Sequence, residues 1–532
     1  IYRVAPAFQQ IVFNEIMAHP APDDGIQYEY VELVNRDSLP ISLQNWQFWV
    51  GSRYWSIGNI TIEPDEYLLI LPEYMAAHPN APEKAIYFFD EADLTDGGTM
   101  LKLIAPDNNI ITWVEYDDIW HTNNLHTLGG YALERIDIQH LCGGSENWQT
   151  STATNHGTPG APNSIAGITI DDTMPEALFY IVPQDTTLQV EFDSPIWPDT
   201  TIANIAINNV DITQAWIEHP YGNTLTMKLS EPLQQDINYQ LTISQYKDCN
   251  MNPMEATQFT FEVPQSPEEN DLIINEVLFN PKTGCNDFVE LLNISDKYLA
   301  IDELNFANAT DDGYPENIKN ISDKRYVLPP NSYYVFTAEY NCLEESYSPV
   351  EKRQTILTTL PSMADAEGSI MILDKVGNTI DMLQYTEKMH NSLLSDKDGV
   401  SLERVSPLAA SDNPSNWVSA AADAGFATPT RQNSNYNNKP ITENNISLLS
   451  ETFSPNGDGF EDYLQINYKF AKGNNIINIR ILDHTGRVVR HLINNESVSV
   501  DGFVNWDGTD DDQHKQPIGV YIVHSEWYDE DG

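Results

Sequence analysis

The sequence predicts an all-β protein made of several β-sandwich domains in series, and three observations carry this prediction. Strand-like runs such as QIVFNEI, TLQVEF and GVYIVH are short and are separated by clusters of Pro, Asn, Asp and Gly. Long amphipathic periodicity is almost absent, so no helix regularly follows each strand as a parallel sheet would require. A chain of 532 residues is also too long for a single core.

Two long segments repeat one pattern in the same order. IVFNEIMAHP at residues 11–20 aligns with LIINEVLFNP at residues 272–281, and YVELVN aligns with FVELLN. Further along, YALER aligns with VSLER, and an Asn-Trp pair follows each of them. The copies close with the tails GTPGAPNS and FATPTRQNS. Because the matches keep their order over residues 8–166 and 270–436, one fold is used twice.

This ordered set of motifs resembles the lamin tail domain, an immunoglobulin-like β-sandwich of nuclear lamins and of many bacterial surface and secreted proteins. The resemblance implies lamin-tail-like domains at residues 1–167 and 267–437. The second copy departs from the pattern at its exit, where ATPT replaces the expected TPG. The last loop of that copy is therefore the part that the resemblance supports least.

The other two segments also resemble immunoglobulin-like domains. Residues 168–266, with TLQVEFDSPI and YKDCNMNP, resemble short modules of bacterial surface proteins. Residues 438–532, with FSPNGDG and WDGTDD, resemble the domain of the flagellar hook-cap protein, a pattern that recurs in C-terminal modules of Bacteroidota surface proteins, including those delivered by the type IX secretion system. The predicted architecture is tandem immunoglobulin-like β-sandwiches.

The charge balance limits the partners. Lys and Arg total 27 against 79 Asp and Glu, which gives a formal net charge of −52. Such a chain repels phosphate backbones and anionic lipids at long range, so nucleic acid is excluded as a primary partner. No apolar run is long enough to span a membrane as a helix. Divalent cations and proteins with basic patches remain as partners, although an acidic surface also serves solubility alone.

Carboxylates recur at matching positions in the two copies, beside Arg135 and Arg404. They are Glu15, Glu32 and Glu134 in the first copy and Glu276, Glu290 and Glu403 in the second. Paired carboxylates can do acid–base work or bind metal. A repeated scaffold explains them better, through ion pairs or hydrogen bonds to the backbone. His121 and His126 lie in a polar loop without a third ligand nearby, and no catalytic motif occurs, so we expect no enzyme activity in these residues.

Calcium is the only cofactor that the sequence suggests. In SPNGDGFEDY, oxygen side chains stand close together around flexible glycines, as hard cations require: Asn456, Asp458 and Asp462. A second candidate loop is WDGTDDD, with Asp507, Asp510 and Asp512. The alternative in both loops is a plain turn into a strand, which needs no ion.

Four aromatic residues in the stretch 45–62, where Arg53 is the only charged side chain, form a candidate protein interface. They are Trp46, Trp49, Tyr54 and Trp55. Strand alternation buries only half of such a run against its own core, and charge-poor aromatic patches are typical of interface centres. A covering loop of the same domain is an equal alternative. By contrast, we interpret the repeated Trp148 and Trp417 as core residues rather than carbohydrate platforms.

Two of the four cysteines fall in the second lamin-tail-like copy, in loops where the first copy has none. We therefore predict a disulfide between Cys285 and Cys342, which suits an oxidising exterior. Cys142 and Cys249 lie in different domains, and their pairing is a weaker prediction.

The resemblance and the lack of a catalytic motif together predict a non-enzymatic scaffold of a Bacteroidota-type bacterium. It would lie on the extracellular face of the outer membrane, or be secreted, and would contact other surface proteins. One alternative is an accessory region of a larger exported nuclease or phosphatase. Another is an adhesin that binds glycan. Both ends of the chain look like edges of an ordered region, so a signal peptide or lipid anchor would lie outside it.

Overall fold

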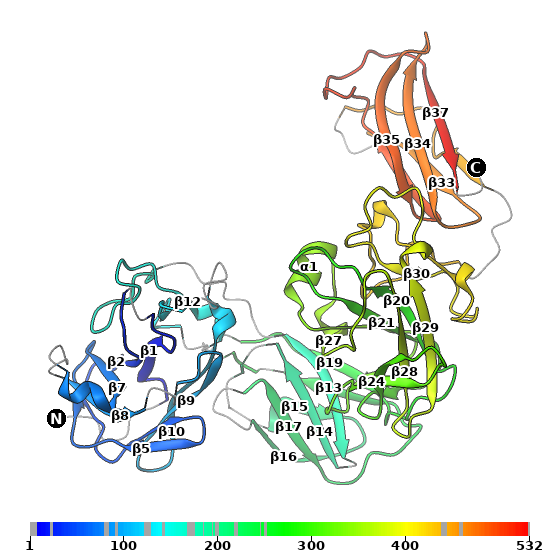
Figure 1. The fold of residues 1–532 in the computed structure, drawn as a ribbon. Helices are drawn as coiled ribbons and strands as arrows, with labels where there is room; N and C mark the ends of the chain where they lie inside the picture. The colour runs from blue at the N-terminus through cyan, green and yellow to red at the C-terminus, as the bar shows by residue number, and fades with distance from the viewer. Residues whose placement is uncertain are drawn as a thin grey trace.

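A computed structural model of the protein confirms the all-β prediction (Figure 1). It describes residues 8–21, 25–78, 84–90, 94–121, 129–140, 144–167, 176–184, 186–193, 195–196, 202–217, 222–244, 246–248, 253–437, 444–456 and 461–529. In these ranges the single α-helix is α1 (Asn341–Tyr347). No helix of the described chain has the length and apolar character needed to cross a membrane.

In the first lamin-tail-like copy, two mainly antiparallel sheets pack face to face. The larger has the order β12 (Trp148–Thr150), β11 (Leu133–Arg135), β1 (Ile11–Met17), β2 (Tyr30–Asn35), β7 (Tyr67–Pro72) and β8 (Ala85–Phe89). The smaller has the order β10 (Ile110–Asp117), β9 (Gly98–Ile104), β4 (Gln47–Val50) and β5 (Arg53–Ser56). A short pair, β3 (Ile41–Ser42) and β6 (Thr61–Ile62), lies beside them. Their facing side chains form one core, in which the rings of Phe13 and Phe48 lie 6.4 Å apart.

The second lamin-tail-like copy repeats this arrangement strand by strand. Its larger sheet reads β31 (Trp417–Ser419), β30 (Leu402–Arg404), β20 (Leu272–Leu278), β21 (Phe288–Asn293), β26 (Tyr333–Thr337) and β27 (Thr355–Leu357). Its smaller sheet reads β29 (Thr379–Thr386), β28 (Glu367–Leu373), β23 (Asn305–Ala309) and β24 (Pro315–Asn320), and β22 (Leu299–Ala300) pairs with β25 (Val327–Leu328). Between β26 and β27 this copy forms α1, where the described residues of the first copy form the 3-10 turn η1 (Glu73–Ala77).

The two remaining segments are smaller sandwiches. The first pairs a sheet of β13 (Ala177–Gln184), β14 (Thr187–Phe192), β17 (Thr224–Leu229) and β16 (Ile212–Ile217) with one of β15 (Ile205–Ile207), β18 (Tyr239–Ile243) and β19 (Thr257–Phe261). The last pairs β32 (Asn445–Leu448), β33 (Leu464–Lys469) and β36 (Asp501–Trp506) with β35 (Val488–Val498), β34 (Asn475–Asp483) and β37 (Tyr521–Tyr528).

Neighbouring sandwiches contact one another directly at two junctions. At the first, the Val182 N–H donates to the Arg325 carbonyl at 3.4 Å, and the ring of Phe179 lies 4.8 Å from that of Tyr326. At the second, the Asp423 carboxylate accepts the N–H and the hydroxyl of Ser499 at 2.9 and 2.8 Å. Each junction combines several contacts. The second lamin-tail-like copy is therefore attached both to the sandwich of residues 176–263 and to the C-terminal sandwich.

Strands β1, β2, β20 and β21 are buried at every position, although a sandwich strand normally exposes one face. Their outer face is covered by the segment that leaves each copy, here called the exit segment, which spans residues 157–165 in the first copy and 427–435 in the second. The repeated carboxylates lie under this cover.

Candidate functional site

A row of three carboxylates crosses the larger sheet of each lamin-tail-like copy. On adjacent strands of the second copy, Glu276 lies directly opposite both Glu403 and Glu290. Glu15 lies opposite Glu134 and Glu32 in the same way. The six side chains have no exposed surface. Like charges directly opposite one another on a sheet are destabilising, so other groups must satisfy these carboxylates.

In the second copy the exit segment supplies those groups. The Thr428 N–H donates to Glu276 at 2.8 Å, and its hydroxyl lies 3.0 Å from Glu276 and 2.8 Å from Glu403. The Thr430 N–H donates to Glu290 at 2.6 Å. The N–H and hydroxyl of Ser434 donate to Glu403 at 2.9 and 2.7 Å. Each carboxylate therefore fastens the exit segment to the sheet.

The first copy makes the same bonds from the matching positions. The Thr158 N–H donates to Glu15 at 2.7 Å, and its hydroxyl donates to Glu134 at 3.0 Å. The Gly160 N–H donates to Glu32 at 2.5 Å. The tail motif is thus explained by its partners: its threonine position presents donors to two carboxylates of the row, and its glycine and serine positions each present a donor to one.

The departure at the second exit has a conformational consequence. Gly160 has φ 79°, and Thr430 takes the same place with φ 63°. This left-handed conformation favours glycine and is costly for a β-branched residue. The Thr430 hydroxyl accepts the N–H of Glu351 at 2.9 Å, a bond that glycine could not make. The sequence Thr-Pro-Thr of the second copy therefore keeps the backbone conformation of the loop and adds a contact to the neighbouring loop.

Arg404, beside the distal glutamate of the second copy, has another role than the expected ion pair with that glutamate. Successive residues of a strand point to opposite faces, so Arg404 points away from Glu403. Its guanidinium pairs with Asp381 at 3.1 Å and donates to the Ile274 carbonyl at 2.8 Å. It also stands over the buried ring of Trp417, 5.3 Å from the centroid. Two structural explanations for the glutamates were ion pairs with the arginines and hydrogen bonds to the backbone. In the second copy Glu403 forms the hydrogen bonds.

Burial changes the acidity of these carboxylates. Burial raises the pKa of Glu15 to about 7 and that of Glu32 to about 8. In the second copy burial, helped by the charge of Glu403, raises the pKa of Glu276 to about 8, and the pKa of Glu290 lies well above its usual value. Each row therefore holds protons near neutral pH. Such groups could serve as general acids, but the exit segments cover them from any substrate.

The histidine of the first polar loop is also structural. His121 Nδ1 lies 3.1 Å from the Thr150 hydroxyl, and the matching His390 Nδ1 lies 3.0 Å from the Ser419 hydroxyl. Burial lowers the pKa of His390 to about 4, which keeps that ring neutral. His126 lies outside the described residues. A contact that recurs in both copies indicates a loop anchor.

The first calcium candidate is described only in part. Asp458 lies outside the described residues, and the Asp462 carboxylate accepts the N–H of Asn456 at 3.0 Å. The calcium site in this loop stays a prediction.

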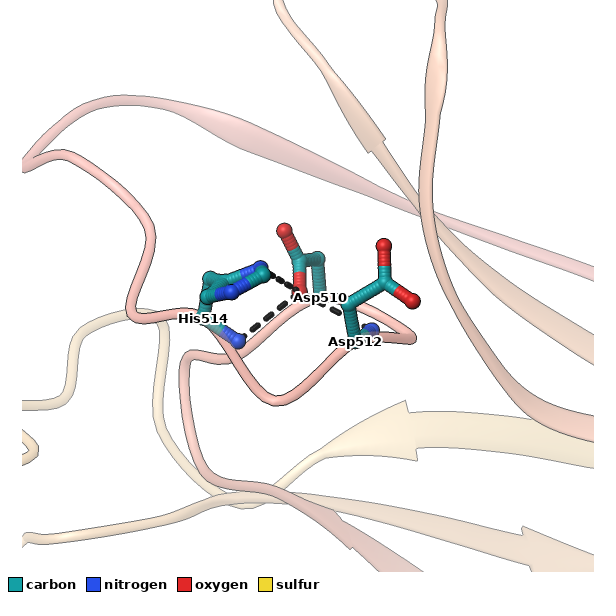
Figure 2. A group of neighbouring side chains, drawn as sticks. All are labelled: Asp510, Asp512 and His514. Atoms are coloured by element: carbon teal, nitrogen blue, oxygen red, sulfur yellow. Dashed lines mark hydrogen bonds and ion pairs between the residues drawn. The ribbon is translucent and has the colours of Figure 1, made fainter.

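In the second candidate loop, Asp510, Asp512 and His514 bring ligand atoms within 4.8 Å of one another (Figure 2). Asp510 also accepts the N–H groups of Asp512 and His514 at 3.0 and 2.9 Å. Asp507 turns instead to the N–H of Thr509 at 3.0 Å. Sequence reasoning missed His514, although its spacing of four from Asp510 signals a shared turn.

The aromatic stretch divides into two pairs. Trp46 is buried in the core with 1% exposure, and Trp55 points inward and stacks on Phe88 at 6.4 Å. Trp46 is therefore a core residue and not a contact residue, because alternation turns it toward the opposite sheet. Trp49 and Tyr54 point outward and stack on each other at 4.7 Å, and Tyr54 is 54% exposed. The repeated Trp148 and Trp417 are buried, at 3% and 2% exposure, as core residues would be.

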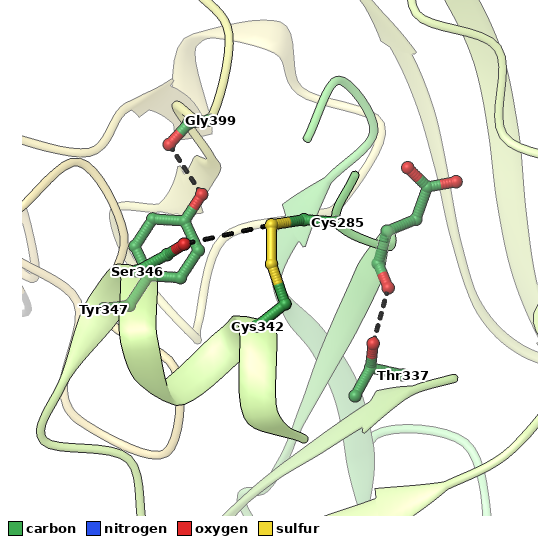
Figure 3. Close-up of a disulfide and its surroundings, with 7 residues drawn as sticks. Cys285, Thr337, Cys342, Ser346, Tyr347 and Gly399 are labelled. Carbon is green, nitrogen blue, oxygen red and sulfur yellow. Dashed lines mark hydrogen bonds between the residues drawn. A yellow bond between two sulfur atoms is a disulfide. The ribbon is translucent and has the colours of Figure 1, made fainter. Parts of the chain in front are cut away.

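The predicted disulfide between Cys285 and Cys342 is present (Figure 3). It joins the loop after β20 to the first turn of α1, across 57 residues of sequence. The Tyr347 hydroxyl at the other end of α1 donates to the Gly399 carbonyl at 2.9 Å. Helix α1 of the second copy is thus fastened at both ends. Cys142 and Cys249 lie outside the described residues.

Three family models match parts of the chain. The lamin tail domain matches residues 5–118, a bacterial Ig-like domain matches residues 165–263, and the CHU_C type IX secretion signal domain matches residues 447–530. The C-terminal match corrects the expected hook-cap domain. The two motifs that carried the hook-cap resemblance, FSPNGDG and WDGTDD, both lie within the matched residues. The secretion signal indicates export to the cell surface or outer membrane.

The solved structures that match parts of the chain do so at low identity. The N-terminal part of the bacterial S-layer protein SbsC is 17% identical, with 32% of this chain and 42% of that chain covered and a TM-score of 0.16. A DUF4876 family protein from Bacteroides thetaiotaomicron is 12% identical, over 39% and 85%, with a TM-score of 0.19. The protein SGBP-B of a Bacteroides ovatus glucan utilization locus is 8% identical, over 99% and 95%, with a TM-score of 0.18. TM-scores this low carry no argument about function, and no curated protein matches the chain.

Proposed function

We propose that the protein is a non-enzymatic scaffold of the cell surface that holds other surface proteins. The observation that carries the proposal is the use of the repeated carboxylates. All of them are buried, and they accept hydrogen bonds from their own exit segments in both copies. Carboxylates that have the same structural role in two copies of a domain suit a scaffold. A catalytic site, by contrast, needs a carboxylate that a substrate can reach.

We also assign residues 267–437 to the lamin tail type. The strand order of this copy equals that of the first, and its carboxylate row, exit segment and Trp417 occupy the same positions. Two such domains, separated by an Ig-like sandwich and followed by a secretion signal domain, suit an exported protein assembled from binding modules.

The proposal is tested by secretion and cross-linking in a bacterium that has the type IX route. The full chain is compared with a variant that lacks residues 447–530, which serves as the control for surface display. Protease treatment of intact cells should cleave only the full chain. Cross-linking followed by mass spectrometry should then recover surface proteins that depend on the display of residues 1–437.

The two alternatives give different results in the same strain. Phosphoester or nucleic-acid hydrolysis by the purified chain, abolished by one substitution within it, would make the protein an enzyme. Retention on polysaccharide without any cross-linked protein would make it a glycan-binding adhesin.

A further inference from the structure

A pocket opens at one end of the first lamin-tail-like copy, where β1 and β10 end and β11 begins. Ile16, Tyr116 and Leu133 form the buried part of its lining, and Ala18 lies beside them. The Tyr116 hydroxyl donates to the Thr95 carbonyl at 2.9 Å. This bond fixes the tyrosine ring beside the pocket.

The second copy fills the same place with a ring of its own. In the aligned motifs IVFNEIMAHP and LIINEVLFNP, Phe279 stands where the first copy has Ala18. Phe279 is buried, and its ring stacks on that of Tyr385, with the centroids 4.2 Å apart and the planes at 21°. It also lies 5.4 Å from the ring of His390. Because Tyr385 takes the place of Tyr116 in the aligned strand β29, the first copy keeps the tyrosine and lacks the ring that covers it.

No ring of the described part of the first copy stacks on Tyr116 in place of the missing one. Tyr131 lines the pocket, but its ring stacks on His156 at 4.0 Å. Trp120, close to the pocket in sequence, lies against Trp148 at 6.3 Å. The larger aromatic side chains around the pocket thus have other contacts, and the place is open to a ring from another molecule.

The rim of the pocket is acidic. Asp96 and Asp118 belong to its lining, and neither pairs with a lysine or arginine among the described residues. Asp96 faces the ring of His19 at 3.9 Å, which makes an ion pair only when that ring is protonated. Asp96 is exposed and Asp118 is half-buried, so a positive charge from outside can reach both carboxylates. The net charge of −52 attracts a basic partner at long range.

We infer that this pocket binds an aromatic side chain of a partner protein, stacked on Tyr116 as Phe279 stacks on its own tyrosine in the second copy. A lysine or arginine of the same partner segment pairs with Asp96 and Asp118 at the rim. Stacked aromatic rings contribute beyond the area that they bury, and aromatic anchors in pockets are typical of the centres of protein interfaces. The inference rests on the proposed function and names the partner chemistry of one surface.

The test is selection of random dodecapeptides displayed on phage against the full chain, followed by binding measurements with the selected peptides. We expect these peptides to share an aromatic residue with a lysine or arginine close to it in sequence. Ala18→Phe gives the first copy the ring that the second copy has. It should lower the affinity of the selected peptides at least about tenfold and leave the unfolding temperature of the first copy unchanged or higher.

The charge of the rim is tested separately. Asp118→Asn should lower the affinity about three- to fivefold, as the loss of one exposed ion pair does. The matched control is Glu115→Gln, which removes an exposed carboxylate of β10 outside the lining of the pocket. It should leave the affinity unchanged.

Several results would overturn the inference. These are peptides that bind Ala18→Phe as tightly as the unchanged chain, a selected motif that lacks the aromatic or the basic residue, or no enrichment at all. If Ala18→Phe unfolds the first copy, the variants Asp96→Asn and Asp118→Asn decide instead, because neither aspartate is buried. Unchanged affinity in both would overturn the inference too. A folded Ala18→Phe chain that keeps every cross-linked surface partner would refute the pocket as a contact and leave the proposed function standing.

Discussion

Replacing Thr428 with valine tests whether the buried carboxylates hold the exit segment. The change keeps the shape of the side chain and removes the hydroxyl that lies 3.0 Å from Glu276 and 2.8 Å from Glu403. The hydroxyl serves two buried acceptors, and a buried acceptor left without its donor costs about 1–3 kcal/mol. We expect the free energy of opening of the exit segment to fall by about 2–3 kcal/mol.

Hydrogen exchange followed by mass spectrometry measures this opening within a multidomain chain. A loss of 2 kcal/mol corresponds to amide exchange about 30-fold faster over residues 427–435. The matched variant is Thr158→Val, which should accelerate residues 157–165 less, because Thr158 is only half-buried and its hydroxyl lies 3.4 Å from Glu15. Exchange within about twofold of the unchanged chain in Thr428→Val, with folding intact, would show that the carboxylates do not hold the segment.

Three further predictions concern the buried carboxylates, the disulfide and the C-terminal loop. Folded-state pKa values of about 8 for Glu32 and Glu276 exceed the unfolded values, so the stabilisation from their protonated forms is complete below about pH 4.5 and is lost as the pH rises through 8. The unfolding temperature should therefore fall as the pH rises from 5 to 8. An unfolding temperature that rises over this range would contradict the raised pKa values. Replacing Cys342 by serine opens a loop of 57 residues and should destabilise the second lamin-tail-like copy by about 4 kcal/mol. Calorimetry should show a lower unfolding temperature for this copy and no change for the first copy. Identical unfolding transitions in the variant and the unchanged protein would contradict this prediction. We propose, finally, that calcium binds the carboxylates of Asp510 and Asp512. Millimolar calcium should then raise the unfolding temperature of the C-terminal sandwich, and Asp512→Asn should reduce the rise. If calcium shifts the unfolding temperature of neither protein, the loop is a plain turn that binds no calcium.

Some features follow from the sequence alone because they depend on local pattern or on a comparison of the copies. Short strand runs without helical periodicity determine the all-β class, and the ordered repeat determines that one sandwich occurs twice. The disulfide could be predicted because Cys285 and Cys342 have no counterparts in the first copy. The burial of Trp148 and Trp417 could be predicted from their matching positions in the two copies.

Only the tertiary structure decided which groups satisfy the buried carboxylates. Glu276 bonds to Thr428, which is 152 residues away, and no local pattern encodes a partner at that separation. The same limit applies to the aromatic stretch, where alternation predicts two faces for Trp46 and Trp49 but not which face is toward the core. Periodicity relates a side chain to its neighbours on the same strand, whereas its cover comes from segments that the fold brings together.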